Sequence, residues 1–164
     1  MRLVNPTELI AERLNVRICT ENMWQYDSLR GCIVPSVCAD PKEFCALIDA
    51  VDSPYLAACL DVGHCALTGY DIPAFIRTLG KDRLKALHIH DNDGRDDLHL
   101  APMTGVINWA VLCDCLKQIG FDGDLSFETF LQVRIAQRFD DELLMPWLKL
   151  ICATGESFRN KIQN

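Results

Sequence analysis

Four short apolar runs divide the chain, and each of them ends in polar residues. The runs cover residues 16–21, 56–61, 84–90 and 125–128. Short segments of this kind are typical of strands that are buried on both faces of a parallel sheet. The pattern therefore predicts four parallel strands.

Helical patterns with clear start and stop signals lie between these runs. Asp40 is followed by Pro41 at the first helical position, and Asn108 begins a stripe of apolar residues that ends at Gly120. Capping side chains, N-terminal prolines and C-terminal glycines mark the two ends of a helix. The longest segment without such a pattern, residues 22–39, is predicted to be a loop.

Three further helices complete the predicted order of elements. One covers residues 6–14, one begins after Asp71, and the last covers about residues 134–158, with Pro146 dividing or kinking it. The chain then consists of one helix and four strand–helix units, which predicts an α/β fold with a parallel sheet and right-handed crossovers. The sequence shows no internal repeat or linker, so residues 1–164 are expected to form a single domain.

The composition fits a soluble globular domain, with 49% hydrophobic and 24% charged residues among 164. The net charge of -7 disfavours the basic surface that nucleic-acid binding requires. The apolar stretches fall short of the ~18 residues needed to span a membrane, and glutamates interrupt the N-terminal segment where a signal peptide would be apolar. We therefore expect a cytoplasmic protein with no membrane partner. Its nine cysteines, an odd number without a CxxC pair, are expected to be mostly reduced.

Each predicted strand ends in a side chain that can bind a metal ion. The four residues are Glu21, Asp61, His88 and Glu128. Ligand sites of α/β sheets and barrels form at the carboxyl ends of the strands, so four such residues in register predict one shared site. Three carboxylates and one imidazole suit Mn²⁺ or Mg²⁺, with Co²⁺ or Zn²⁺ as alternatives. The other interpretation is four separately solvated or capping residues.

Small residues share the face of these candidate ligands, because residues two apart on a strand point the same way. They are Cys19, Cys59, Ala86 and Ser126. A plain packed core more often carries Val, Ile or Leu at such positions. The small residues therefore predict room for an inward-facing site.

Three motifs keep a fixed order along the chain: Cys-Leu-Asp-Val-Gly-His at 59–64, Leu-His-Ile-His-Asp-Asn-Asp-Gly-Arg-Asp-Asp-Leu-His-Leu at 87–100, and Phe-Glu-Thr around Glu128. Together they resemble the sugar phosphate isomerase/epimerase family of xylose-isomerase-like TIM barrels. Glu21 is similar to the glutamate at the end of the family's fifth strand. The match covers strands five to eight only. It implies half of a TIM-type barrel whose N-terminal half is absent, since a complete barrel typically needs ~250 residues.

The resemblance also implies roles for individual residues. The metal ligands would be Glu21, Asp61, His88 and Glu128, while His64 and Arg95 would contact substrate oxygens. A divalent ion chelated by adjacent carbonyl and hydroxyl oxygens acidifies the carbon between them and stabilises an enediolate. The predicted activity is isomerisation or epimerisation of a sugar or sugar phosphate, with Glu21 and Glu128 as the acid/base pair. The family's Gly-Glu-Gly turn is replaced here by residues 101–105.

The remaining histidines have weaker interpretations. His64 could cap a helix or bond its own loop. His90 shares a face with His88, and of the two His88 is taken as the ligand because the resemblance places the ligand first; His90 would be a second-layer or substrate contact. His99 is expected to be an exposed loop histidine.

Acidic residues gather around His99, and they leave a second function class open. Asp91, Asp93, Asp96 and Asp97 are expected to be solvated or to cap turns. However, Asp97-Leu98-His99 resembles the Asp-x-His metal pair of type-four apurinic endonucleases, so a metal-dependent phosphodiesterase stays an alternative. Four histidines and a charge of -7 disfavour it. A third alternative is a truncated half-barrel without turnover.

The predicted half-barrel has two unpaired edges, near residues 16–21 and 125–130. Exposed strand edges promote association. Two copies related by a two-fold axis could place the last strand of each beside the first strand of the other and so complete eight strands. The sequence therefore predicts a homodimer as one outcome, with a capped monomer as the alternative.

Overall fold

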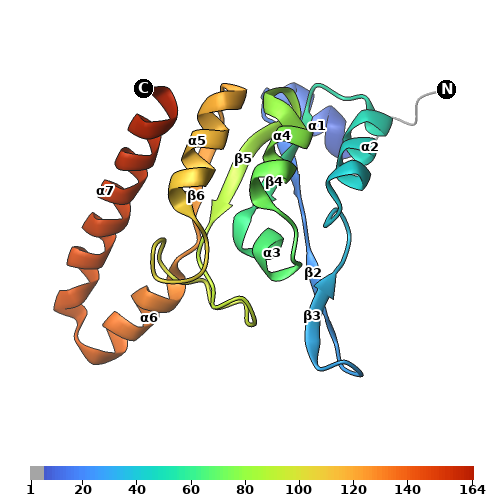
Figure 1. Cartoon of the computed structure of the whole chain (residues 1–164). Coiled ribbons are helices and arrows are strands. Elements are labelled where there is room, and N and C mark those ends of the chain that lie inside the picture. Colours follow the sequence, from blue (N-terminus) through green and yellow to red (C-terminus); the bar gives the residue numbers. More distant parts are fainter. Residues whose placement is uncertain (1–5) are drawn as a thin grey trace.

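A four-stranded parallel sheet forms the centre of the computed structural model, which describes residues 6–164. Its strands are β1 (Ile18–Glu21), β4 (Leu56–Asp61), β5 (Leu84–Ile89) and β6 (Asp124–Phe127). They pair in parallel in the order β1-β4-β5-β6. The four predicted strands are confirmed. The sheet does not close on itself, because β1 and β6 are its two edges, so the fold is an open, partial barrel (Figure 1).

The predicted loop at 22–39 is wrong in part, because the structure forms a hairpin there. Strand β2 (Trp24–Asp27) pairs antiparallel with β3 (Cys32–Pro35). In the turn between them, Asp27 Oδ1 accepts the backbone N–H groups of Leu29 and Arg30. Strand β2 alternates apolar and polar residues over only four positions, and the apolar run of β3 is equally short, so the sequence analysis did not identify either strand. The hairpin extends from the end of β1 beyond the rest of the sheet (Figure 1).

Four helices begin and end largely where the sequence predicts: α1 (Pro6–Leu14), α2 (Pro41–Val51), α4 (Ile72–Arg83) and α5 (Trp109–Ile119). The short helix α3 (Val62–Leu67), which directly follows β4, was not predicted. The caps are formed: Asp40, Asp71 and Asn108 each accept backbone N–H groups in the first turn of the helix that follows. These side chains satisfy donors that have no partner within the helix.

The predicted kink at Pro146 is wrong. The C-terminal helical region divides earlier, into α6 (Phe130–Phe139), the 3-10 turn η1 (Asp141–Leu143) and α7 (Leu144–Gln163). The break is at Asp140, whose backbone is extended. Pro146 lies in the first turn of α7, where the missing N–H removes no helical hydrogen bond.

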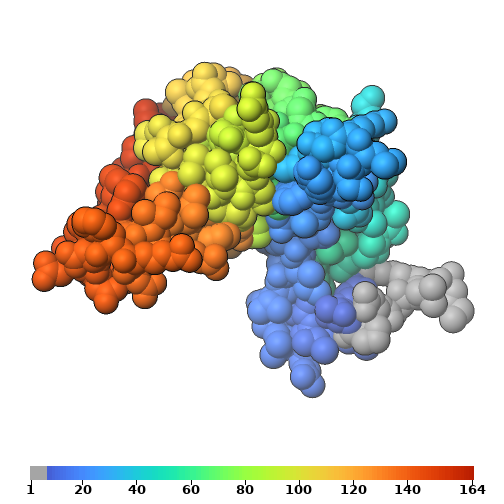
Figure 2. Space-filling model, turned by 90° about the horizontal axis from the view of Figure 1, so that it is seen from below, coloured from blue at the N-terminus to red at the C-terminus, as the bar shows by residue number. Residues whose placement is uncertain are grey.

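The hydrophobic core lies between the sheet and the helices. Leu60, Leu87 and Ile89 on the strands are fully buried and belong to one cluster with residues of α2, α4 and α5. The opposite face of the sheet is open at its edges, where Cys19 and Ser126 are exposed. Figure 2 shows the molecule hollowed between the regions of α1 and α6, which flank the two edge strands. In the described part of the chain, none of the helices combines the length and the apolar character needed to cross a bilayer.

Candidate functional site

The sheet register brings the predicted ligands to one edge. Asp61 is paired with His88, and Glu21, the last residue of β1, is paired with Cys59. Glu128 directly follows β6, and its N–H donates to the Ile89 carbonyl, which continues the ladder by one residue. The four side chains therefore start from neighbouring carboxyl ends, as expected for parallel strands.

These four side chains converge on the imidazole of His88. Its Nδ1 atom lies 3.4 Å from Glu21 Oε2, 3.4 Å from Glu128 Oε1 and 3.9 Å from Asp61 Oδ2. The same Nδ1 is buried and makes no hydrogen bond within the described residues. A nitrogen without a partner surrounded by three carboxylates is a donor set that fits a divalent cation.

The charge of Glu21 is stabilised in place. Burial raises its pKa, but the neighbouring imidazoles of His64 and His88 outweigh burial and bring the pKa down to about 2. Glu21 is therefore ionised at neutral pH. An ionised carboxylate can bind a cation or accept a proton from a substrate carbon.

Asp61 is held from several sides although it is fully buried. Its Oδ1 accepts the backbone N–H of His64 at 2.7 Å and so caps α3. The His90 Nε2 atom lies 3.0 Å from both carboxylate oxygens of Asp61. A Cβ at residue 63 would overlap the His90 ring, so Gly63 makes this approach sterically feasible. His90 is therefore placed to orient the carboxylate of Asp61, and Asp61, His90 and Glu128 also lie close enough together to share a metal ion.

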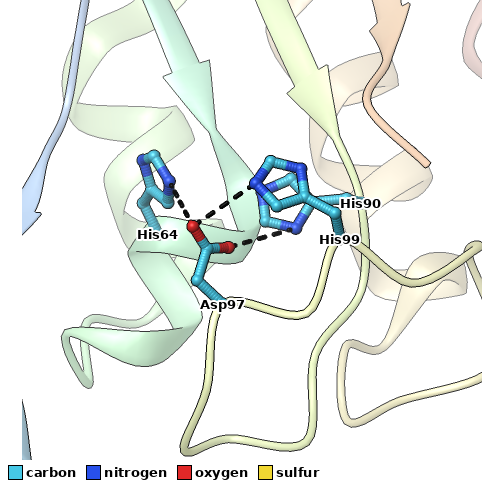
Figure 3. A group of neighbouring side chains, drawn as sticks. All are labelled: His64, His90, Asp97 and His99. Atoms are coloured by element: carbon cyan, nitrogen blue, oxygen red, sulfur yellow. Dashed lines mark ion pairs between the residues drawn. The ribbon is translucent and has the colours of Figure 1, made fainter. Parts of the chain in front are cut away.

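A second group of possible metal ligands adjoins the first and consists of His64, His90, Asp97 and His99 (Figure 3). Asp97 Oδ2 lies 3.4 Å from His64 Nε2 and 3.3 Å from His99 Nε2. Asp97 Oδ1 lies 3.8 Å from His90 Nδ1, and neither of these two atoms has a hydrogen-bond partner in the described chain. The three imidazoles thus surround one carboxylate.

Oxygen acceptors on the far side of each ring define the orientation of these imidazoles. His64 Nδ1 lies 3.0 Å from the Asn22 carbonyl, and His99 Nδ1 lies 2.9 Å from the Glu128 carbonyl. Each carbonyl accepts a hydrogen bond from the Nδ1–H group, which leaves Nε2 directed at Asp97. Burial lowers the pKa of His64, but Asp97, Glu21 and Asp61 outweigh it and raise the pKa to about 10. The arrangement attracts positive charge, and its imidazole ligands suit Zn²⁺.

Two predictions about the loop between β5 and α5 are wrong. The His99 side chain is only 13% exposed, and its ring stacks on His90 at 4.1 Å between centroids. Asp91 is fully buried and accepts from the Trp109 indole N–H at 2.9 Å and from the backbone N–H of Ile107. Sequence pattern alone does not show this burial, because it comes from contacts with Ile107, Trp109 and Glu128, which are distant along the chain.

The other loop residues behave differently. Asp93 accepts the backbone N–H groups of Arg95 and Asp96 and is exposed, as predicted for a turn cap. Arg95 is also exposed, and no ion pair in the described chain joins it to the candidate ligands. The structure therefore does not bring Arg95 into the site.

Two residues near the site were not identified from the sequence. The Trp24 indole N–H donates to Asp97 Oδ2 at 3.2 Å, and the buried Asn22 contacts Asp61 and His64. Both lie in the segment that was predicted to be a loop. Asn22 directly follows the candidate ligand Glu21 at the end of β1, and this position could have indicated that Asn22 lies near the site.

The family model described as xylose isomerase-like TIM barrel matches residues 4–149. The chain belongs to this family. Among its curated relatives, an uncharacterized protein of Methanocaldococcus jannaschii is 31% identical over 144 residues. The match covers 87% of this chain and 46% of that protein. A probable endonuclease 4 of Mesomycoplasma hyopneumoniae is 32% identical over 97 residues, covering 52% of this chain and 34% of that protein.

Solved structures show the same fold. A D-tagatose 3-epimerase-like protein is 29% identical with a TM-score of 0.63, covering 90% of this chain and 52% of that one. A D-psicose 3-epimerase from Clostridium cellulolyticum H10 has a TM-score of 0.69 at 19% identity, over 92% of this chain and 52% of that one. The xylose isomerase-like chain thus spans about half the length of these proteins. The predicted family and the partial-barrel fold are confirmed.

Proposed function

We propose that this chain carries the metal centre of a divalent-metal-dependent isomerase or epimerase that acts on a sugar or sugar phosphate. The observation that carries the proposal is the convergence of three carboxylates on the unpartnered Nδ1 of His88. The likeness to a D-tagatose 3-epimerase-like protein supports a sugar as the substrate. The oxygen-rich donor set favours Mn²⁺ or Mg²⁺, with Co²⁺ or Zn²⁺ as alternatives.

The residues that would hold the ion are Glu21, Asp61, His88 and Glu128. When bound, the ion would acidify the C–H group of a hydroxyl-bearing carbon next to a substrate carbonyl and would stabilise the negative charge that remains after proton loss. Glu21 and Glu128 contact His88 from β1 and β6, the two edges of the sheet. One of these two carboxylates then removes the substrate proton, and the other, once protonated, returns a proton. Return to the opposite face of the same carbon gives epimerisation, and return to the neighbouring carbon gives isomerisation. His64, with Nε2 free of a backbone partner, is proposed to contact a substrate oxygen.

The metal assignment is tested by titrating Mn²⁺ into wild type, Asp61→Ala and His88→Ala. We expect both variants to lose most of the affinity, because each removes a ligand. Affinity equal to wild type in both variants would overturn the site. In a chain with turnover, Glu21→Gln and Glu128→Gln should each abolish deuterium incorporation from solvent into the sugar, and retained exchange would remove that residue from the acid/base role.

The second cluster favours another candidate function, a metal-dependent phosphodiesterase of the apurinic endonuclease type. Asp97 with His64, His90 and His99 supplies further metal ligands beside the first site, and one relative is named a probable endonuclease 4. The charge of -7 argues against a DNA-facing surface. Incubation with abasic-site DNA in Zn²⁺ or Mn²⁺ separates the two: cleavage supports the phosphodiesterase. Metal binding without either activity supports the half-barrel without turnover.

A further inference from the structure

Asn22 lies where the chain leaves β1 for the hairpin, and it is 1% exposed. Its side-chain amide pairs with the backbone of Asp61: Nδ2 donates to the Asp61 carbonyl at 3.0 Å, and Oδ1 accepts the Asp61 N–H at 2.7 Å. The main chain itself turns away here, since the Met23 N–H donates to the carbonyl of Val37, two residues after the hairpin ends. The side chain of Asn22 therefore replaces a peptide group at the end of the β1–β4 ladder.

The main chain of Asn22 makes a second contact, with His64. The Asn22 carbonyl lies 3.0 Å from His64 Nδ1, and Glu21 Oε1 lies 3.2 Å from the same nitrogen. Both neighbours are oxygen acceptors, so Nδ1 carries a proton whether the ring is neutral or charged. Nε2 is then the atom that faces Asp97.

We propose that Asn22 is a positioning residue that fixes the backbone of Asp61 and the ring orientation of His64 together. Only an amide offers a donor and an acceptor at this spacing. Aspartate lacks the donor, glutamine is longer by one methylene group, and alanine leaves two buried backbone groups of Asp61 without their partner. The effect on metal affinity rests on the proposed metal centre, whereas the positioning itself does not.

The chain offers a matched control in Asn92, which is also fully buried. Its Nδ2 donates to the Gly63 carbonyl at 3.0 Å, and its Oδ1 accepts the Gly94 N–H at 2.8 Å. It therefore binds the first turn of α3, two residues after Asp61, but it makes no hydrogen bond to Asp61 or His64 in the described chain. Asn92→Ala removes comparable buried hydrogen bonds without touching the proposed positioning contacts.

The first experiment is Mn²⁺ titration of wild type, Asn22→Ala and Asn92→Ala. Loss of a partner that orients a ligand typically weakens metal binding 10–100-fold, so we expect a loss of about that size in Asn22→Ala and a change within about threefold in Asn92→Ala. Wild-type affinity in Asn22→Ala would overturn the proposal, as would an equal loss in both variants.

The second experiment needs no metal, and its first measurement needs no variant. In ¹⁵N-labelled wild type, the His64 Nδ1 proton should exchange with solvent far more slowly than that of an exposed imidazole, because it is bonded to the Asn22 carbonyl. Exchange as fast as in free imidazole would contradict the proposal even if Asn22→Ala fails to fold. Where Asn22→Ala folds, it should accelerate this exchange and Asn92→Ala should not. If wild type binds no Mn²⁺, the proposed function fails, while slow exchange would still support the positioning role.

Discussion

The two faces of the sheet differ in what they bury, and β4 shows the difference within two residues. Leu60 points to the helices and is fully buried among apolar side chains. Asp61 points to the other side and is equally buried, but among the hydrogen-bonding groups of His64 and His90. The helix side stabilises the fold by removing apolar surface from water. On the opposite side the burial of polar groups is unfavourable and lowers the stability of the fold.

The buried carboxylate of Asp61 on that second face indicates that the face forms a site. A buried carboxylate is tolerated only where hydrogen bonds or opposite charges compensate for lost hydration. Away from the strand ends the same face carries the small or exposed residues Cys19, Ala86 and Ser126. The structure therefore separates a face that holds the fold together from a face that holds the site.

The largest effect is expected from Leu60→Ala. Removing a fully buried leucine leaves a cavity and should lower the free energy of unfolding by about 2–5 kcal/mol. Because the side chain faces away from the site, the folded fraction should keep its Mn²⁺ affinity. Urea denaturation and metal titration of the same sample test both statements, and a large loss of affinity in folded protein would show that the two faces are coupled.

Much of this organisation follows from the sequence, for a physical reason. Strand ends and helix caps depend on residues that are close together in the chain, so local patterns are enough to place Glu21, Asp61 and the cap Asp40. They are not enough to place the hairpin, because its two strands have only four residues each and depend on pairing with one another. The burial of Asp91 and His99 depends on long-range contacts with Trp109 and Glu128, which no local pattern reports.

Gly63→Ala is expected to have an intermediate effect, which lowers both the stability of the fold and the affinity for Mn²⁺. An added methyl group would overlap the His90 ring, which in turn orients the carboxylate of Asp61. Overpacking of this kind typically costs about 1–3 kcal/mol, more than the roughly 1 kcal/mol that alanine gains over glycine in a helix. We expect a lower urea midpoint together with weaker Mn²⁺ binding. Unchanged metal affinity would mean that His90 does not orient Asp61.

A smaller effect is expected from pH on chelator-treated protein. The pKa of His64 is raised from 6.5 to about 10, with burial opposing the shift and Asp97 and Glu21 causing it, so its stabilising contribution is complete below pH 6.5 and is lost as the pH rises through about 10. The pKa of Glu21 is lowered from 4.5 to about 2, so its contribution is present above pH 4.5 and is lost as the pH falls through about 2.

The thermal midpoint should therefore be highest between pH 4.5 and 6.5 as far as these two groups determine it, and should fall by a few degrees toward pH 9. Glu21→Gln removes one of the partners of His64 and should reduce the alkaline fall. Saturating Mn²⁺ should reduce it as well, because a bound cation replaces protons in neutralising the carboxylates. A midpoint that rises from pH 6 to 9 without metal contradicts the assigned direction of the His64 shift.

The smallest effect is expected from Ser126→Val on the open face of β6. Ser126 is exposed, and valine suits a strand, so the free energy of unfolding should change by no more than about 0.5 kcal/mol. This expectation holds for a chain whose open face is in contact with water. The predicted homodimer would instead cover that face, and a bulkier side chain would then disturb the interface and make the urea midpoint depend on protein concentration. Urea denaturation of wild type and Ser126→Val at two concentrations, with light scattering on the same samples, decides between these outcomes. A monomer mass with no dependence of the urea midpoint on concentration would exclude the dimer. A dimer mass in wild type that falls in Ser126→Val would place the second copy on the face that carries the site.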